Sequence, residues 1–147
     1  MRNNKFNDSG LLVELADTTL HIARKLRAYP LQRTGFVPIS PLEALVMLHV
    51  YKRPGVSPSD LAQELALRSS NAATALRGLV KKGQVERRAD PEDKRVARLY
   101  LTPTAEEAIV TVRCMWKELL SQADISEEDL HIAVKVLTTI NSTLVEP

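Results

Sequence analysis

One segment of the chain carries a local excess of positive charge. Between positions 68 and 98 there are nine basic and four acidic residues, although the whole chain of 147 residues has a formal net charge of only +2. A basic block inside a nearly neutral chain suits a surface that faces phosphate groups. Composition alone also allows a charged face that meets only solvent. Residues 103–147 are acidic instead, with three basic and eight acidic residues.

Small and polar residues open this basic block, at a spacing that places them on one face of a helix. We expect a helix that follows Ser70 and runs to about Lys82, with Gly83 as its C-terminal cap. The major groove of B-DNA is about 12 Å wide and admits one helix, and small polar side chains let the backbone approach the base edges. The side chains expected on this reading face are Ser69, Ser70, Asn71, Thr74, Arg77 and Lys81.

Each of these side chains also has a plainer interpretation. Ser69 or Ser70 could cap the helix, and a serine can cap a helix and contact DNA at once. Asn71, Thr74 and Arg77 could be ordinary surface residues. We favour contact with DNA because they stand on the leading turns of a candidate recognition helix, with Arg77 in reach of a guanine or a phosphate.

The basic block continues into a two-stranded ribbon. Residues 85–88 suit a short strand, and residues 96–101 alternate between apolar and polar side chains. The polar stretch between them, Ala-Asp-Pro-Glu-Asp-Lys-Arg, is too long for a tight hairpin and predicts a charged tip. Arg87 is expected to pin the ribbon by pairing with the helical core. The other basic residues, expected to contact the DNA backbone or to stay free in solvent, are Arg88, Lys94 and Arg98.

Five further segments have helical periodicity, so the predicted fold is mainly α, with six helices and a small two-stranded β-wing. The start signals are a Ser-Pro-Leu-Glu capping box at 40–43 and a serine or threonine before three other helices. A single domain is expected over residues 9–147, after a flexible N-terminal segment of residues 1–8. On the recognition helix, the predicted buried residues are Ala72, Leu76, Leu79 and Val80.

Two short helices joined by a tight turn and followed by a basic ribbon make a winged helix-turn-helix. The tip Asp-Pro-Glu-Asp-Lys-Arg at 90–95, followed by Val-Ala-Arg-Leu-Tyr-Leu-Thr, resembles the signature of the multiple-antibiotic-resistance regulator (MarR) family. A Leu…Lys-Gly…Val-Glu-Arg pattern at 79–87 and a Leu-Ala…Leu pattern at 61–65 resemble the same family, with a departure at Gln84. By motif the resemblance spans residues 41–101, and by element order the whole chain.

This resemblance implies a homodimer that binds double-stranded DNA, most often as a repressor. Residues 9–40 and 103–147 would form the dimerisation helices, and residues 41–101 the winged helix that binds DNA. The resemblance also implies that Arg95 enters the minor groove, where a narrow groove concentrates negative potential and attracts arginine. Asp93 is expected to orient Arg95 or to close the wing by a salt bridge. The operator should then be a near-palindrome with half-sites about one turn of DNA apart.

The resemblance further implies release from DNA by a small aromatic or anionic effector, bound between the dimer helices and the reading domain. The candidate lining residues are His21, Arg24, Met47, His49, Tyr51, Arg113 and Trp116. The two arginines could meet a carboxylate of the effector. Trp116 and Met47 also fall on apolar stripes that are typical of a core, and the histidines could be hydrogen-bonded structural residues. A regulator that stays on DNA without any ligand response is an alternative.

Cys114 is the only cysteine, so it offers a possible thiol switch but no internal disulfide. A reactive thiol needs a lowered pKa and access to solvent, and Arg113 and Lys117 lie close to it in sequence. The peroxide-sensing members of the MarR family keep their reactive cysteine in the first helix, where this chain has none. We therefore expect a buried or bystander Cys114, with thiol-based redox sensing as the alternative.

Other function classes have little support in the sequence. It has no glycine-rich phosphate loop, no Gly-x-Ser-x-Gly elbow and no His/Glu zinc motif, so we expect neither an enzyme nor a cofactor. The histidines at 21, 49 and 131 are far apart, which argues against a metal site. Without a basic-then-apolar leader or a long apolar run, a cytoplasmic protein with no membrane association is expected. A winged-helix module that binds another protein is the remaining alternative.

Overall fold

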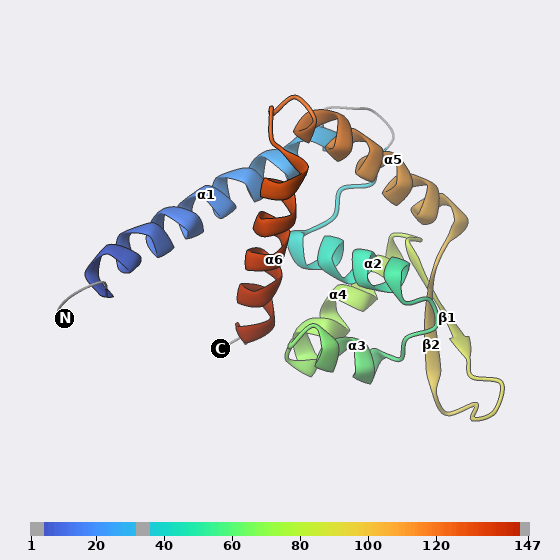
Figure 1. The fold of residues 1–147 in the computed structure, drawn as a ribbon. Coiled ribbons are helices and arrows are strands. Elements are labelled where there is room, and N and C mark those ends of the chain that lie inside the picture. Colours follow the sequence, from blue (N-terminus) through green and yellow to red (C-terminus); the bar gives the residue numbers. More distant parts are fainter. Residues whose placement is uncertain (1–4, 32–35, 145–147) are drawn as a thin grey trace. The chain divides into compact units, whose positions relative to one another are not determined.

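The computed structural model describes residues 5–31 and 36–144. Six helices are present there, with two strands between the fourth helix and the fifth (Figure 1). The predicted fold class, mainly α with a small two-stranded wing, is therefore confirmed. The chain divides into two compact units, Met1–Pro38 and Ile39–Pro147.

The N-terminal unit contains one long helix, α1 (Lys5–Leu31). It begins four residues before the predicted start, so residues 5–8, which were expected to be flexible, are helical; residues 1–4 lie outside the described part. No proline stands within residues 5–8 to prevent a helix there. Several large apolar side chains of α1 are more than 60% exposed, namely Leu11, Leu12, Val13 and Leu20.

In the second unit, hydroxyl side chains start four of the five helices: α2 (Pro41–Lys52), α3 (Pro58–Glu64), α5 (Pro103–Leu120) and α6 (Glu127–Thr143). At α2 the hydroxyl of Ser40 accepts the backbone N–H of Glu43 at 3.1 Å. In return the Glu43 carboxylate accepts the backbone N–H of Ser40 at 2.6 Å. The predicted capping box is confirmed, because it depends only on residues four positions apart or fewer.

The fourth helix, α4 (Ser69–Lys81), starts differently. Its N-cap is Arg68, whose side chain makes no capping hydrogen bond, so neither Ser69 nor Ser70 caps the helix. The chain reverses before it at Ala66, which takes a left-handed conformation with φ +52. At the other end Gly83 has φ +67, the conformation in which glycine is favoured after a helix, as predicted.

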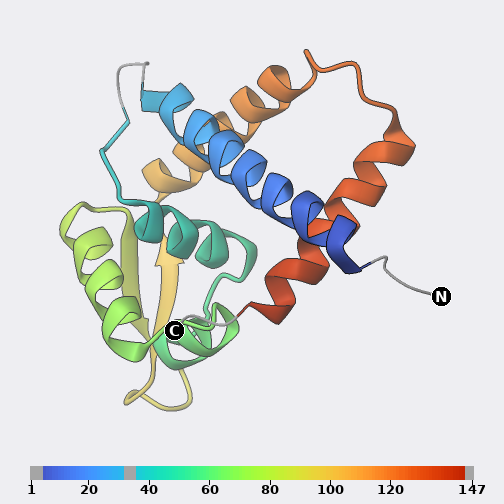
Figure 2. The same ribbon diagram turned by 90° about the vertical axis from the view of Figure 1, so that its left-hand side faces the viewer.

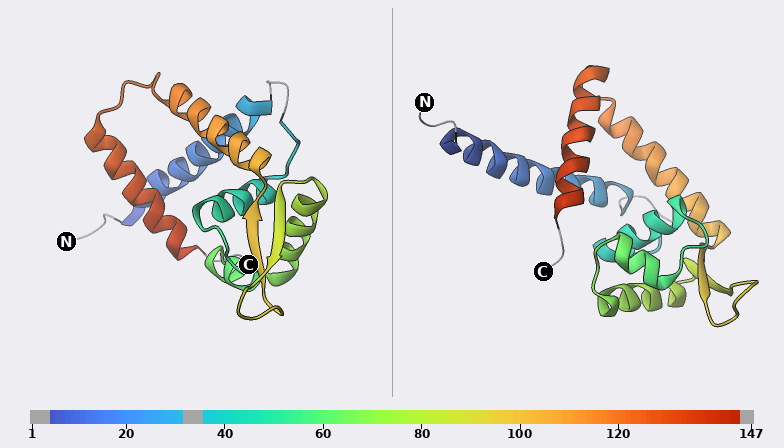
Figure 3. Two further views of the ribbon diagram at one scale, coloured as in Figure 1. Left: turned by 90° about the vertical axis from the view of Figure 1, so that its right-hand side faces the viewer. Right: turned by 60° about the horizontal axis from the view of Figure 1, so that its bottom comes forward.

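The wing is an antiparallel pair, β1 (Val85–Ala89) and β2 (Ala97–Leu101), in which Val85 lies opposite Leu101 and Ala89 opposite Ala97. The loop between α2 and α3 adds to this sheet, since Gly55 N donates to Leu99 O at 2.8 Å and Leu99 N donates to Val56 O at 3.0 Å. The ribbon and its tip loop project from the helices of this unit (Figure 3). Helix α4 packs against β1 (Figure 2).

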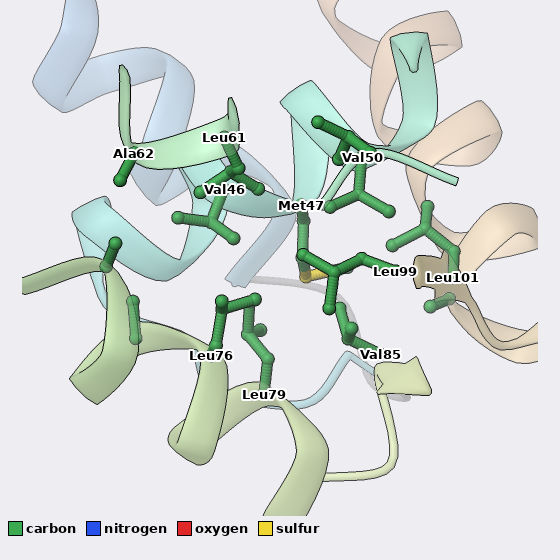
Figure 4. Packing of buried hydrophobic residues seen from close by; sticks show 14 residues of the cluster. Val46, Met47, Val50, Leu61, Ala62, Leu76, Leu79, Val85, Leu99 and Leu101 are labelled. Atoms are coloured by element: carbon green, nitrogen blue, oxygen red, sulfur yellow. The ribbon is translucent and has the colours of Figure 1, made fainter. Parts of the chain in front are cut away.

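The hydrophobic core of the second unit lies where α2, α3, α4 and the wing meet (Figure 4). Val46, Leu61, Leu76, Leu79 and Leu99 come from these four elements, and all are 0% exposed. On α4 one expectation was wrong. Val80 is 42% exposed, and Ala75 takes its predicted place in the core at 5% exposed.

The C-terminal helices leave much of their apolar surface exposed. Among the large residues of α6, Val134 is 64% exposed and Ile132 is 54% exposed, and no residue of this helix is buried. On α5, Ala105 and Met115 are buried, whereas Val110 and Leu120 are about half exposed. Within the residues that the structure describes, none of the helices is both long and apolar enough to cross a membrane.

Candidate nucleic-acid interface

The exposed face of α4 carries all six residues predicted to read DNA. Ala72, Ala75, Leu76 and Leu79 turn the opposite face of the helix toward the core. Exposed side chains with small, amide, hydroxyl and basic groups are what contact with base edges and phosphates requires. The residues that α4 presents to solvent in this way are Ser69, Ser70, Asn71, Thr74, Arg77 and Lys81.

Arg77 is oriented along this face by its neighbour one turn earlier. Its Nη2 donates to the hydroxyl of Thr74 at 3.0 Å. A guanidinium has five donors, so this bond leaves others to meet a guanine or a phosphate. Thr74 and Arg77 therefore form a polar pair at the centre of the predicted reading face.

The C-terminal end of α4 carries an ion pair that the sequence analysis did not predict. Lys82 Nζ lies 2.7 Å from the Glu43 carboxylate of α2, whose side chain is only 9% exposed. Burial raises the pKa of Glu43, but the hydrogen bonds from Lys82 and from the backbone N–H of Ser40 outweigh burial and leave the pKa below its ordinary value. Glu43 is recognisable in the sequence as a capping residue, but its partner 39 positions away has no local signal.

The wing tip is held in shape by Asp90. Its carboxylate accepts the backbone N–H groups of Glu92 at 2.8 Å and of Asp93 at 3.0 Å, and the Nε of Arg98 at 2.6 Å. The backbone N–H of Asp93 contributes most to lowering the pKa of Asp90 to about 2, followed by the bond from Arg98. Arg98 also donates to the carbonyl of Gly55 at 3.3 Å, so the expectation that it stays free in solvent was wrong.

Asp93 holds the backbone at Arg95 and does not pair with the Arg95 guanidinium. The Asp93 carboxylate accepts the backbone N–H of Arg95 at 3.0 Å, and it forms no salt bridge within the described residues. The side chains of Lys94 and Arg95 are exposed and pair with no carboxylate in the part of the chain that the structure describes. The tip therefore presents two cations on a loop whose backbone is fixed by two aspartates.

The remaining basic residues of the wing differ in their surroundings. Arg88 pairs with Glu86 and lies over the ring of Tyr100, 4.4 Å from its centre, which is a cation–π geometry. Arg87 is exposed and makes no ion pair among the described residues, so its predicted pairing with the helical core is wrong. Arg87 stands on the exposed stretch of β1, opposite Leu99, and among the described residues no side chain of the core helices forms an ion pair with it.

The lowered pKa of Asp90 gives a pH prediction with a definite sign. Its folded-state pKa of about 2 lies below the ordinary value of 3.8, so the tip bonds contribute stability above pH 3.8 and lose it as the pH falls through about 2. We expect the carboxyl carbon of Asp90, followed by NMR, to titrate near pH 2 with the amide shifts of Glu92 and Asp93. A midpoint near 4, equal to that of an exposed aspartate, would contradict this account of the tip.

Comparison with known proteins identifies similar sequences and similar folds. A model of the MarR family matches residues 37–96, which include α2 to α4 and most of the wing. The uncharacterized HTH-type transcriptional regulator YdgJ of Bacillus subtilis (strain 168) is 31% identical over 109 residues, covering 71% of this chain. The chain spans less than two thirds of that relative's length, since the match covers 64% of it.

Solved structures share the fold over nearly the whole chain. The MarR family transcription regulator SP03579 superposes with a TM-score of 0.71 at 20% identity, over 95% of this chain and 94% of that one. Streptococcus pneumoniae FabT, solved in complex with DNA, gives a TM-score of 0.64 at 24% identity, over 95% of this chain and 96% of that one.

In sequence and in fold, the chain is similar to the MarR family. Members of this family are transcription regulators and not enzymes. The family match covers the reading helix and the two aspartates of the wing tip, so the resemblance stated from the sequence is confirmed.

The candidate effector residues occupy different surroundings. His49 Nε2 lies 2.8 Å from the carboxylate of Glu64, which also pairs with Arg53, so this histidine is a hydrogen-bonded link between α2 and α3. Arg113 lies over the ring of Tyr51, 5.7 Å from its centre. The remaining candidates are the buried Met47 of α2, the half-buried Trp116 of α5, and the exposed His21 and Arg24 of α1, which belongs to the other unit.

The thiol of Cys114 is exposed, so of the two expectations, a buried or a bystander cysteine, the first was wrong. Cys114 lies on α5, one residue before Met115, and Met115 is on the buried side of that helix. Across the described ranges, 5–31 and 36–144, no three histidine, cysteine or acidic side chains gather closely enough to hold a metal ion.

Proposed function

We propose that this protein is a transcriptional regulator of the MarR family that binds double-stranded DNA as a homodimer and acts as a repressor. The observation that carries this proposal is the pairing of two exposed surfaces on one small unit. One is the polar and basic face of α4, and the other is the wing tip with Lys94 and Arg95. Base edges and phosphates are contacted by these residue types in other helix-turn-helix proteins.

Each element has its own task in this proposal. The helix α4 lies in the major groove, where Asn71, Thr74 and Arg77 face base edges and Ser69, Ser70 and Lys81 face the backbone. Arg95 enters the flanking minor groove, while Lys94 and Arg88 contact phosphates. The stiffness of the tip supports this division, because Asp90 accepts three hydrogen bonds there and limits the entropy lost on binding.

The homodimer is supported by apolar surface that the single chain leaves exposed. On α1, Leu12 is 61% exposed and Leu20 is 67% exposed; on α6, Val134 is 64% exposed. Monomeric proteins rarely leave whole helices of apolar side chains in water, so these helices fit an interface between copies. A two-fold dimer would present two reading helices about 34–36 Å apart, which requires a near-palindromic operator.

Repression and release complete the proposal. A dimer bound over a promoter excludes polymerase. A small aromatic or anionic effector would release the dimer from DNA by favouring a spacing of the two α4 helices that no longer fits the operator. The residues proposed to meet such an effector are His21, Arg24, His49, Arg113 and Trp116. A protein that binds chromosomal DNA would act in the cytoplasm.

The salt dependence of binding tests the phosphate contacts. Two cations of the basic block are paired with largely buried carboxylates, Lys82 with Glu43 and Arg98 with Asp90, which lowers the number available to DNA. With about four phosphates neutralised per protomer, the slope of log K against log salt should be about −7 for the dimer. Fluorescence anisotropy of labelled duplex across a salt series measures it.

A slope near zero, or binding that is no tighter to duplex DNA than to an unrelated polyanion, would contradict the proposal. It would instead favour the alternative in which the winged helix contacts a protein partner. A slope near half of the expected value, together with a monomeric mass in solution, would contradict the dimer alone.

A further inference from the structure

The C-terminal end of the reading helix α4 is held from two sides. On one side, the Lys82 ammonium reaches the Glu43 carboxylate at the start of α2, at 2.7 Å. On the other, the hydroxyl of Thr102, the N-cap of α5, donates to the carbonyl of Gly83 at 2.8 Å, and its backbone N–H donates to Gln84 O at 3.1 Å. The end of α4 therefore lies between the starts of two other helices.

The carboxylate of Glu43 takes part in two interactions at once. Its Oε2 accepts both the backbone N–H of Ser40 and the ammonium of Lys82. Ser40 is the second residue of the unit that begins at Ile39, so it stands where the chain enters from the N-terminal unit. One side chain, nine-tenths buried, thereby connects that entry point to the end of the reading helix.

The backbone of α4 is shaped to admit this carboxylate. A Cβ placed on Gly78 would overlap Glu43 Oε1, so any other residue there would displace the carboxylate or push α4 away from α2. Because Oε1 and Oε2 belong to one carboxylate, moving Oε1 also moves Oε2 and disturbs its hydrogen bonds to Ser40 and Lys82. Gly78 is one turn from Lys82, whose backbone N–H donates to the Gly78 carbonyl at 3.0 Å.

We propose that Glu43 is a positioning residue for DNA reading. Through its contacts with Lys82 and Gly78, Glu43 sets the position of α4 against α2. This position in turn sets the depth at which α4 meets base edges. This inference rests on the proposed DNA-binding function. It assigns Lys82 to α4 placement rather than to a phosphate, although Lys82 is one of the nine basic residues of the block. The lowered pKa of Glu43 agrees with a carboxylate that stays charged in this contact.

Three substitutions separate this role from plain electrostatics and from helix capping. Glu43→Gln keeps an oxygen that can accept the Ser40 N–H, because glutamine also completes a capping box, but it removes the charge that faces Lys82. Lys82→Met removes the other partner at similar size. Gly78→Ala displaces the carboxylate without any change of charge. Matched controls are Glu107→Gln and Lys117→Met on the exposed face of α5.

The measurement is the ratio of affinities for two duplexes of equal length, one recovered from a random pool by the wild-type protein and one with the same bases scrambled. We expect each of the three variants to lower this ratio about tenfold, because one charged hydrogen bond in a buried pair is lost. The double variant of Glu43→Gln and Lys82→Met should lower it no further than either single variant, and the controls should leave it unchanged.

Electrostatics alone predicts the opposite for Glu43→Gln. Removing a negative charge would strengthen binding to both duplexes and leave their ratio unchanged, and this result would overturn the proposal. A Lys82→Met variant that weakens both duplexes equally and makes the salt slope shallower would also overturn it, because Lys82 would then be a phosphate contact.

Amide hydrogen exchange in the absence of DNA provides a readout that does not depend on DNA binding. The backbone N–H groups of Gly83 and Gln84 donate to Val80 and Leu79 carbonyls at the end of α4. We expect their exchange to become at least about tenfold faster in Glu43→Gln and in Gly78→Ala. Unchanged exchange overturns the positioning role even if DNA binds. A wild-type protein that prefers neither duplex overturns the proposed function instead, and the exchange data still decide the role of Glu43.

Discussion

Replacement of Arg95 by alanine is expected to weaken binding to the operator duplex by about 1–3 kcal/mol, with the fold intact. The side chain is exposed, so its removal leaves no cavity, and the loop that carries it is fixed by Asp90 and Asp93 through backbone N–H groups. An arginine presented by a rigid loop can insert into a narrow minor groove without first being ordered. Titration of labelled operator by anisotropy, with circular dichroism of the variant, measures both parts of this prediction.

Lys94→Ala is the matched control for Arg95→Ala, because the two residues are adjacent, exposed and equally charged. Lys94 is proposed to contact only phosphate, so its loss should weaken binding uniformly across sequences and make the salt slope shallower by about 1 per site. Equal losses for the two variants on every duplex would show that Arg95 acts as a general cation. An Arg95→Ala protein with unchanged affinity and salt slope would contradict the wing assignment outright.

Replacement of Leu76 by alanine is expected to lower the free energy of unfolding by about 2–5 kcal/mol. Leu76 is 0% exposed and lies in the core between α2, α3 and α4, where close packing allows little collapse around the missing atoms (Figure 4). Denaturant unfolding at one fixed protein concentration measures the change, since dimer stability depends on concentration.

Val80→Ala on the same helix is the control for Leu76→Ala. Val80 is 42% exposed, so its truncation should cost less than about 1 kcal/mol, the usual size for a partly exposed site. Similar losses at both positions would mean that α4 is oriented differently against the core, and the reading face would then be placed wrongly.

Local patterns in the sequence were sufficient for the starts of four helices, α2, α3, α5 and α6. The capping box at Ser40 and Glu43 and the glycine that ends α4 act between residues a few positions apart, so their chemistry is visible in the sequence. The exposed polar face of α4 could also be predicted, because polar and apolar residues alternate with the helical period. Val80 was misplaced since it borders the apolar stripe, and only the packing of α2 and α3 decides which edge is covered.

Contacts between distant parts of the chain were not predictable in this way. Arg98 pairs with Asp90 across the tip and reaches Gly55 in the loop before α3, and Lys82 pairs with Glu43 of α2. Each pair depends on how helices and strands are packed, and many charged residues in the block could have filled either role. As a result the sequence overestimates the number of cations that are free to meet phosphates.

The central claim, that α4 and the wing read DNA as a two-fold dimer, is tested most directly by selecting bound duplexes from a random pool with the purified full chain. The account predicts enrichment of a near-palindromic sequence whose half-sites are about one helical turn apart, flanked by segments with a narrow minor groove that admits Arg95. A pool that stays unenriched, with only weak binding that fades with salt, would contradict sequence-specific reading by this chain.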